Sequence, residues 1–274
     1  MEADDRRPVI ECISLLRVFE SATGRVQAVR GVDLTIESGR TVAVVGPSGS
    51  GKSSLLRMIG GLDTPTAGDV LVDGVNLVHL SSSARRRTRA RLLAHVHQRP
   101  MDNLLGHLTA LDQVVRVARR RGVGIGESAE MLDSLGLAHR ADHLPDQLSG
   151  GEQQRLAFAR GAVGSPAVII ADEPTAELDT ESTDLVLDAI ERLTRTGITA
   201  LVATHDPRVL ERVDQVVTLR DGSIASVTES GTELAVIDRA GRIQLPPEAR
   251  AHFADRRARV VWDPDRQTFT LERP

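Results

Sequence analysis

Aromatic residues, cysteine and lysine are scarce in this sequence. Tyrosine is absent, aromatic residues make up 2% of the chain, and Cys12 is the one cysteine among 274 residues. A single cysteine excludes an internal disulfide and a zinc site built from cysteines, and it suits a reducing compartment. Only one of the 34 basic residues is a lysine, Lys52. We therefore expect Cys12 in the core, and the surroundings of Lys52 become the first place to look for function.

Long apolar runs are missing as well. Runs such as residues 41–45 and 167–171 are far shorter than the roughly 18 residues that a membrane-spanning helix needs. Residues 1–8 are rich in charge, and no apolar segment follows them that could serve as a signal peptide. We therefore expect the chain to stay in the cytoplasm and to meet a membrane only through a partner.

The charge balance is ordinary. Hydrophobic residues make up 41% and charged residues 26% of the chain, as in soluble globular proteins, and the formal net charge is −4. That charge gives no general basic footprint for a phosphate backbone, so no nucleic acid is expected as a partner. The arginine run at residues 85–91 lacks interleaved aromatic residues for base stacking, so we expect a solvated helix face there.

A glycine-rich segment carries the lysine. Residues 40–61 read RTVAVVGPSGSGKSSLLRMIGG, which is an apolar run, a glycine-rich turn and a helical pattern. Glycines let backbone amides curl around phosphate oxygens, and the following helix adds its free N–H groups. Lys52 can reach the β and γ phosphates, and the Ser53 hydroxyl can coordinate Mg²⁺. A chance match to this pattern is unlikely in a chain whose other basic residues are arginine. The residues expected to contact nucleotide here are Gly46, Pro47, Ser48, Gly49, Ser50, Gly51, Lys52, Ser53 and Ser54.

Two acids follow a second apolar run. Residues 168–173 read VIIADE, as expected of a buried strand whose carboxyl end faces a ligand. Asp172 is then expected to hold Mg²⁺, and Glu173 is expected to polarise the attacking water as a general base. Taken alone, the pattern also fits a strand that ends in two exposed acids.

A third motif makes the comparison specific. Residues 148–155 read LSGGEQQR, in which Ser149 is suited to open a helix whose N-terminus forms a second anion site. With these three motifs in this order, the chain resembles the ABC ATPase family over residues 9 to about 228. The resemblance implies an α/β P-loop NTPase core at residues 1–228, with a helical subdomain at about 98–160. It also implies that ATP and Mg²⁺ are the cofactors.

The resemblance implies roles for further residues. Gln98 resembles the Q-loop glutamine, which in the family touches Mg²⁺ or water and relays to the membrane partner. His205 resembles the H-loop histidine, which contacts the γ-phosphate. Phe19 falls where the family has an aromatic residue that stacks on adenine, although a core phenylalanine is nearly as good an interpretation. The residues that the resemblance places at the partner subunit's ATP are Ser149, Gly150, Gly151, Glu152 and Asp179.

The same resemblance concerns assembly. In the family, the phosphate loop of one subunit and the signature of another enclose each ATP, which implies a homodimer here. Residues 61–74, 103–114 and 139–155 are similar to the lipoprotein-releasing and macrolide-export branch, whose ATPases drive a separate integral membrane permease. The chain is then expected at the cytoplasmic face of the membrane, bound through that permease. Two alternatives stay open, a soluble ABC ATPase acting on nucleic acid or ribosomes and a regulatory DNA-binding protein.

The C-terminal residues depart from this pattern. Residues 227–231 are expected to be a short polar linker, and residues 232–274 a small β-rich appendage. Within the appendage we expect a strand, a turn at Ala240–Gly241, a second strand and a helix opened by Pro246–Pro247.

A closing hairpin is expected at residues 259–273, with its turn at 263–265. The segment DRAGRIQLPPEAR is similar to AbrB-like swapped-hairpin domains, in which two chains interlock and which often bind DNA. Residues 231–274 contain eight arginines and seven acids, a net charge of +1, which is weak for binding a polyanion. Dimerisation is therefore the expected role of the appendage, with Trp262 and Phe269 as core or interface anchors.

Overall fold

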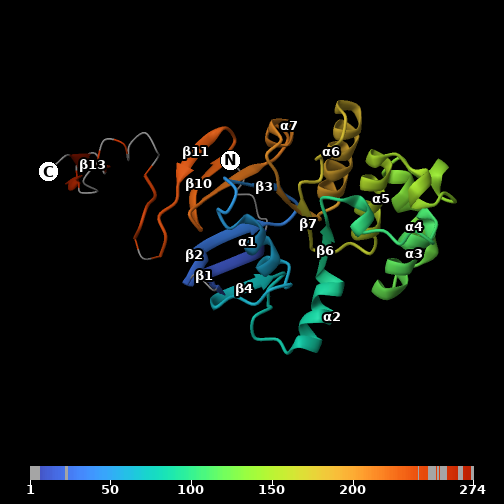
Figure 1. Ribbon diagram of the computed structural model, residues 1–274, viewed down its shortest axis with the longest axis horizontal. Coiled ribbons are helices and arrows are strands. Elements are labelled where there is room, and N and C mark those ends of the chain that lie inside the picture. The colour runs from blue at the N-terminus through green and yellow to red at the C-terminus, as the bar shows by residue number, and fades with distance from the viewer. Residues whose placement is uncertain are drawn as a thin grey trace.

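The protein is built on β-sheets, which are seen in Figure 1. The computed structural model describes residues 7–21, 24–239, 241–245, 251, 253, 258–264 and 268–272. Within these residues, one sheet has four antiparallel strands. Its order is β2 (Gly24–Glu37), β1 (Pro8–Ser21), β4 (Ala67–Val72) and β5 (Val75–Asn76).

A seven-stranded sheet carries the apolar runs. Its order is β11 (Thr232–Ala235), β10 (Ser223–Glu229), β9 (Gln215–Arg220), β3 (Thr41–Val45), β8 (Thr199–Ala203), β7 (Val168–Asp172) and β6 (Leu93–Val96). The strands from β9 to β6 run parallel, and β3, β7 and β8 are almost wholly buried, as expected of strands covered on both faces. Val44 of β3 and Asp172 of β7 both pair with Ala203 of β8. The residues that follow these strands therefore meet at one edge of the sheet.

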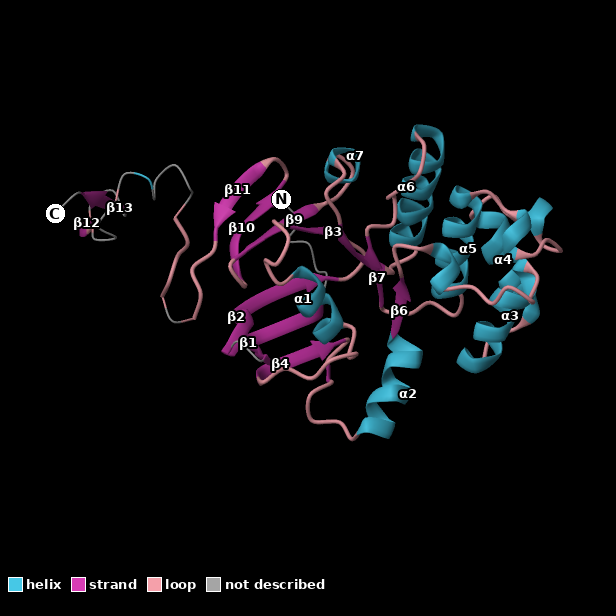
Figure 2. Cartoon of the chain, viewed as in Figure 1, coloured by secondary structure: helices cyan, strands magenta, loops and turns pink. Residues whose placement is uncertain are grey.

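Helix α1 (Lys52–Ile59) joins the two sheets and contacts strands of both, as Figure 2 shows. Its side chains Leu55, Met58 and Ile59 are at most 1% exposed and belong to an apolar cluster with residues of both sheets, including Cys12. The expectation that Cys12 lies in the core is confirmed. This packing holds the first turn of α1 at the carboxyl end of β3.

A group of helices forms the other part of the core (Figure 1). Phe158 is 1% exposed and packs in an apolar cluster that holds Leu132, Leu137 and Ile190. The expected helical subdomain at about 98–160 contains two of these helices and most of a third, and its limits stay a prediction. The helices are α3 (Ala110–Arg121), α4 (Ile125–Ser134), α5 (Gly150–Ala162) and α6 (Thr180–Arg195), with α2 (Ser82–Leu92) and α7 (Pro207–Leu210) elsewhere and 3₁₀ turns at Pro100–Asp102, Ala138–Arg140 and Pro145–Gln147.

The arginines of α2 only partly match the expected solvated face. Arg85 donates through Nε to the Leu77 carbonyl at 3.0 Å, and its guanidinium also contacts the Val78 carbonyl at 3.3 Å. Burial lowers the pKa of Arg89, with a further contribution from the charge of Arg85. A fully solvated face is therefore wrong for these two side chains, because Arg85 binds the connection from β5 to α2 and Arg89 is partly buried.

Arg121 joins the end of α3 to its neighbours. Its guanidinium donates to the carbonyls of Ala90 at 3.0 Å, Leu93 at 3.0 Å, Gly161 at 2.6 Å and Val163 at 2.7 Å. Burial lowers the pKa of Arg121 to about 10, and the charge of Arg160 contributes in the same direction. This side chain thus uses its donors to fasten α2, β6 and the end of α5 together.

The C-terminal part differs from the expectation in two places. Residues 227–231 are not a linker, because 227–229 end β10 and pair with β11 around a turn whose Ser230 and Gly231 have φ of 49° and 78°. The next two expected strands reduce to one bridge between Ile237 and Ile243. The closing hairpin is confirmed, as β12 (Arg259–Asp263) pairs with β13 (Thr268–Glu272). The expected helix at Pro246–Pro247 lies outside the described residues, and the swapped hairpin stays a prediction.

Partly buried His95 predicts a loss of stability in acid. Burial lowers the pKa of this imidazole from 6.5 to about 4, although Nε2 lies 3.3 Å from the Gly60 carbonyl. Between pH 6.5 and 4 the unfolded chain therefore binds a proton that the folded chain does not. We expect the free energy of unfolding to fall by about 3 kcal/mol across this window as pH decreases.

The measurement is urea unfolding from pH 7 to 4 for the wild type and for His95→Gln. The variant lacks the imidazole and should lose about 3 kcal/mol less than the wild type across the same window. Parallel pH profiles of the two proteins would contradict this assignment. Carboxylates with lowered pKa values act in both proteins alike, so they cancel in the comparison.

Candidate active site

The loop between β3 and α1 accepts only glycine at two positions. Gly46 has φ of 147°, and a Cβ there would lie 2.1 Å from the Leu219 carbonyl oxygen. Gly51 has φ of 104°, and a Cβ there would lie 2.2 Å from the Ala28 carbonyl oxygen. Any side chain would therefore force the loop away from β9 and β2. The glycines of the predicted phosphate loop are required by close backbone approach as well as by conformation.

Lys52 is the first residue of α1 and folds over this loop. Its Nζ donates to the Gly46 carbonyl at 2.6 Å and to the Pro47 carbonyl at 3.3 Å. The first amides of a helix have no partner within the helix, so residues 52–54 present N–H groups beside the ammonium group. Ser53 is exposed in this first turn. The loop and helix start thus combine a cation, amide donors and a hydroxyl, as an anion site requires.

Glu173 and His205 meet at the edge of the same sheet. Glu173 follows β7 with φ of 44°, and its amide donates to the Ala203 carbonyl at 2.8 Å. The His205 amide donates to Glu173 Oε2 at 3.2 Å, and His205 Nε2 lies 3.7 Å from Oε1. A non-glycine residue with positive φ is uncommon and worth a functional explanation. Here it turns the carboxylate from the end of β7 toward the residues that follow β8.

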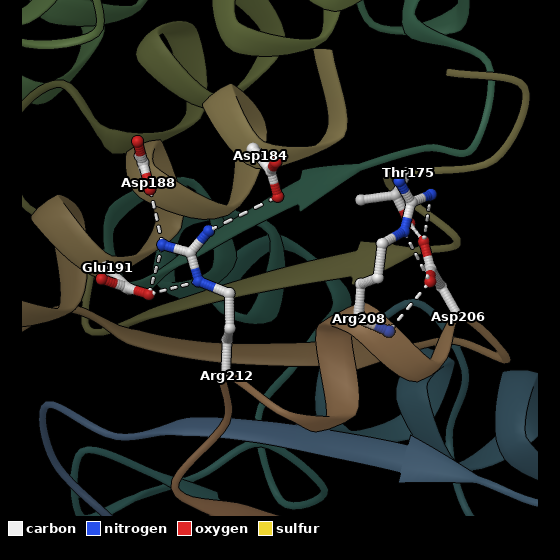
Figure 3. A network of polar contacts seen from close by, with 7 residues as sticks. All are labelled: Thr175, Asp184, Asp188, Glu191, Asp206, Arg208 and Arg212. Atoms are coloured by element: carbon white, nitrogen blue, oxygen red, sulfur yellow. Dashed lines mark hydrogen bonds and ion pairs between the residues drawn. The ribbon is translucent and has the colours of Figure 1, made fainter. Parts of the chain in front are cut away.

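A network beside this pair, drawn in Figure 3, connects the two loops. The Thr175 hydroxyl donates to Asp206 Oδ2 at 3.2 Å, Arg208 lies 3.1 Å from the same oxygen, and the Asp206 amide donates to Thr204 Oγ1 at 3.0 Å. Burial alone would raise the pKa of Asp206, but the hydrogen bonds from Arg208 and Thr175 outweigh it and lower that pKa. The sequence reasoning missed these residues, although an aspartate before Pro207 is a helix-capping signal.

A second set of contacts in Figure 3 joins Arg212 to helix α6. Arg212 reaches Asp188 at 2.5 Å, Glu191 at 2.6 Å and Asp184 at 4.0 Å. The hydrogen bond with Asp188 is the largest cause that raises the pKa of Arg212. The segment after His205 is thus tied to the helix that begins after Asp179. Asp179 itself is exposed and caps α6, because its Oδ1 accepts from the Ser182 amide at 2.7 Å.

Gln98 lies in the loop after β6, the strand that pairs with β7. Val96 of β6 is opposite Ala171, so this loop leaves the sheet at the edge where Asp172 ends β7. Gln98 is exposed and Asp172 is half-buried. Both residues therefore belong to the set of side chains at the carboxyl ends of the parallel strands.

The signature motif opens α5 with a capping box. The Ser149 amide donates to Glu152 Oε2 at 2.8 Å, and the Glu152 amide donates to Ser149 Oγ at 3.3 Å. Arg140 Nε also donates to Glu152 Oε1 at 2.8 Å. Burial would raise the pKa of Glu152, but the bonds from Ser149 and Arg140 outweigh it and lower that pKa. Glu152 is thus occupied in fixing the helix start, a role that the sequence reasoning missed.

Gly151 brings α5 close to α6. A Cβ at this position would lie 2.7 Å from the Ser182 Cβ, and a Cβ at Gly150 would lie 3.4 Å from Leu178 Cδ2. Among the described residues, no hydrogen bond or ion pair joins 149–152 to the loop at 46–54. The structure therefore places the loop, Glu173 and His205 at the carboxyl ends of neighbouring strands, and the signature on a separate element of the same chain.

Phe19 lies on β1, opposite Val26 of β2. Its side chain is 37% exposed, so it is not a fully buried core residue. The Arg17 guanidinium carbon lies 4.5 Å from the centre of its ring, an arrangement that suits a cation–π contact. Its role in stacking on adenine stays a prediction.

Across the part of the chain that the structure describes, no helix has the length and the apolar character that crossing a bilayer would take.

Known proteins resemble this chain over most of its length. The ABC transporter family matches residues 29–176. The lipoprotein-releasing system ATP-binding protein LolD of Syntrophotalea carbinolica is 42% identical over 221 residues, which cover 79% of this chain and 96% of that protein. LolD of Hyphomonas neptunium is 37% identical over 228 residues, which cover 81% of this chain and 99% of that protein.

Solved structures of ATP-binding cassettes also resemble this chain. The ATP-binding cassette MJ0796, described as a dimeric post-hydrolysis state bound to ADP and Pi, superposes with a TM-score of 0.72 and 31% identity, over 80% of this chain and 98% of that one. CbiO1 of Clostridium perfringens, part of an ABC transporter complex, superposes with a TM-score of 0.71 and 25% identity, over 81% and 88% of the two chains. The expected α/β P-loop fold is confirmed. The chain belongs to the ABC transporter family as one of its ATP-binding cassette ATPases.

Proposed function

We propose that this ATPase binds ATP with Mg²⁺ at the loop between β3 and α1 and acts as the ATP-binding subunit of a membrane transporter. The observation that carries the proposal is the convergence of Lys52, Glu173 and His205 at the carboxyl edge of β3, β7 and β8. Lys52 and the amides at the start of α1 bind the phosphates, since the loop is shaped by glycines to bring backbone N–H groups inward.

Three side chains suit a magnesium ion. The Ser53 hydroxyl, the Asp172 carboxylate and the Gln98 amide are hard oxygen donors, the kind that Mg²⁺ prefers. Ser53 lies in the first turn of α1, Asp172 ends β7 and Gln98 follows β6, all at the same edge of the sheet. When bound, Mg²⁺ would supply neutralisation of charge on the β and γ phosphates.

Glu173 is the proposed general base. It takes the proton of a water molecule whose oxygen attacks the γ-phosphorus, while the bond from that phosphorus to the β–γ bridging oxygen breaks and leaves ADP and phosphate. His205 orients the carboxylate through its amide at 3.2 Å, and its imidazole lies on the same side for contact with the γ-phosphate. The hydrogen bond from Thr175 to Asp206 joins the loop that holds Glu173 to the loop that holds His205.

A homodimer supplies the missing half of each site. Ser149, Gly150 and Gly151 stand at the start of a helix, where free amides attract an anion, and they are not joined to their own phosphate loop. The signature of one copy would therefore close on ATP held by the other, with Asp179 at the same junction. The dimeric state described for MJ0796 supports this arrangement.

The transported cargo would be handled by a separate permease. The two relatives named above are subunits of lipoprotein-releasing systems, which supports an integral membrane permease of that branch as the partner and a place at the cytoplasmic face of the membrane. The alternative of a soluble ATPase on nucleic acid or ribosomes has no such support.

A cleft beside the Gln98 loop suits this partner. It has a volume of about 490 Å³ and lies between α2, β6, α3 and α5. Burial lowers the pKa of Arg160, and the charges of Arg116 and Arg120 lower it further. The arginines at this cleft therefore repel one another. An acidic segment of the permease would relieve that repulsion and press on both parts of the core. The charged side chains that line the cleft are Arg86, Arg89, Arg120, Arg121, Arg160 and Asp102.

The test is isolation of the tagged chain from detergent-solubilised membranes. Wild type should bring down an integral membrane protein, and the double variant Arg86→Glu/Arg120→Glu should recover about tenfold less of it, because two attractive contacts become repulsive. ATP hydrolysis by the isolated variant should stay at the wild-type rate, since neither residue is near the phosphate loop.

The control is Arg87→Glu/Arg119→Glu. These exposed arginines are the sequence neighbours of the first pair on α2 and α3, do not line the cleft, and give the same change in net charge. Equal loss with both double variants would assign the effect to net charge. Recovery of ribosomes or nucleic acid in place of a membrane protein would refute the transporter function.

A further inference from the structure

The segment after β11 lies beside β2 and the turn between β9 and β10, with which it lines a cavity. We call residues 236–239 and 241–245 the strap. Asp238 and Arg242 form its turn, since the Asp238 amide donates to the Arg242 carbonyl at 2.9 Å and Arg242 Nε donates to Asp238 Oδ2 at 2.7 Å. Ile237 and Ile243 bridge its two sides. The strap is therefore a small closed loop with structure of its own.

Polar contacts from Arg239 and Gln244 fasten the strap to the core. Arg239 Nε lies 3.1 Å from Asp33 Oδ1 on β2, and the Gln244 side-chain amide donates to the Arg220 carbonyl at 3.1 Å. Between the strap and the core lies a cavity of about 490 Å³, whose lining includes Asp33 and Gln244. Val236 of the strap also packs against the apolar core cluster, so the strap is held by apolar packing at its start and by these polar contacts beyond it.

The second contact leads directly to the phosphate loop. Arg220 ends β9, and the turn that follows it contains Gly222. The Gly222 amide donates to the carbonyl of Ser50 in the phosphate loop at 3.0 Å, and the Gly222 carbonyl accepts from the Arg30 amide at 2.7 Å. Gln244 is thus separated from the loop by one short turn, and that turn is also a neighbour of Gly51.

We infer that Gln244 is a positioning residue for nucleotide binding: by holding the Arg220 carbonyl it seats the β9–β10 turn that in turn seats the phosphate loop. The inference rests on the proposed phosphate site. The regions matched to the two LolD proteins span 96% and 99% of those proteins but only 79% and 81% of this chain. Roughly a fifth of this chain therefore has no counterpart in those two proteins. Through Gln244, the C-terminal part of this chain would influence the ATP site.

The experiment measures ADP affinity and ATP turnover of the full-length variant Gln244→Ala. Loss of one hydrogen bond should weaken ADP binding by about two- to tenfold, as measured by calorimetry. The rate at saturating ATP should change less than about twofold, because Glu173 and His205 are held from β7 and β8. Hydrogen exchange should rise in peptides covering 46–52 and 219–224, with other regions unchanged.

Two further variants separate positioning from mere stability. Gln244→Lys keeps a donor for the carbonyl and should restore ADP affinity, whereas Gln244→Glu keeps the shape without a donor and should behave like alanine. Glu233→Ala on the exposed strand β11 is the control and should bind as wild type.

Unchanged affinity in Gln244→Ala, wild-type affinity in Gln244→Glu, or a rise of exchange across the whole chain would overturn the inference. Failure of the phosphate site itself gives a different result, since ADP binding would then survive Lys52→Ala. With that variant unable to bind and Gln244→Ala weakened as described, the positioning role stands.

Discussion

Replacement of Glu173 with glutamine is expected to lower ATP turnover by about 10²- to 10⁴-fold while nucleotide binding is retained. Glutamine has the same shape, and its carbonyl can still accept from the His205 amide, but it cannot take a proton from water. Phosphate and signature contacts stay intact, so the ATP-bound dimer should accumulate. Phosphate release at saturating ATP and light scattering with and without ATP measure the two effects.

The matched control is Glu177→Gln, which makes the same acid-to-amide change four residues further along the same loop. Glu177 is exposed and has φ of 65°, so the backbone context is similar. Its turnover should stay within about twofold of wild type. If Glu173→Gln turned over ATP as fast as this control, the base would have to be another group.

Mixing two inactive variants is expected to restore activity. Lys52→Ala removes the cation of the phosphate loop, and Ser149→Arg fills the helix start of the signature, so each homodimer should lose nearly all turnover. In a mixed dimer both defects fall in one of the two shared sites, and the other site is intact. Random pairing gives half mixed dimers with one working site of two, hence about a quarter of wild-type turnover.

The control mixture combines Lys52→Ala with Glu173→Gln. Both defects belong to the half-site at the carboxyl edge of the same sheet, so each ATP site of a mixed dimer carries one of them and activity should stay absent. Restoration in both mixtures, or in neither, would rule out sites shared between a loop and a signature of different copies. ATP hydrolysis across a range of protein concentrations is the measurement.

Much of this arrangement could be predicted because its signals are local. The glycines of the loop at 46–51 form a local sequence pattern, and the apolar runs of β3, β7 and β8 indicate buried parallel strands. Once three strands are parallel, the residues that follow them must converge, so Glu173 and His205 could be placed near Lys52 in advance. The separation of the signature from its own phosphate loop was implied by the family resemblance alone.

What could not be predicted depends on contacts distant in sequence. Arg85 lies in a run that looks solvated, and only the fold brings it onto the carbonyls of Leu77 and Val78. The Thr175–Asp206 bond joins residues whose motifs give no sign of one another. The β10–β11 turn was mistaken for a linker because polar residues with Gly231 suit either, and pairing with a sheet decides the matter.

The attachment of Lys52 to its own loop has a consequence for covalent modification. Since it is the one lysine of the chain, acylation or any other modification of a lysine amine can occur within the sequence only at this ammonium group. An acyl group there would remove the charge and leave one N–H where the ammonium group now donates to the Gly46 and Pro47 carbonyls. Lysine acylation of this protein and occupation of its ATP site should therefore exclude each other.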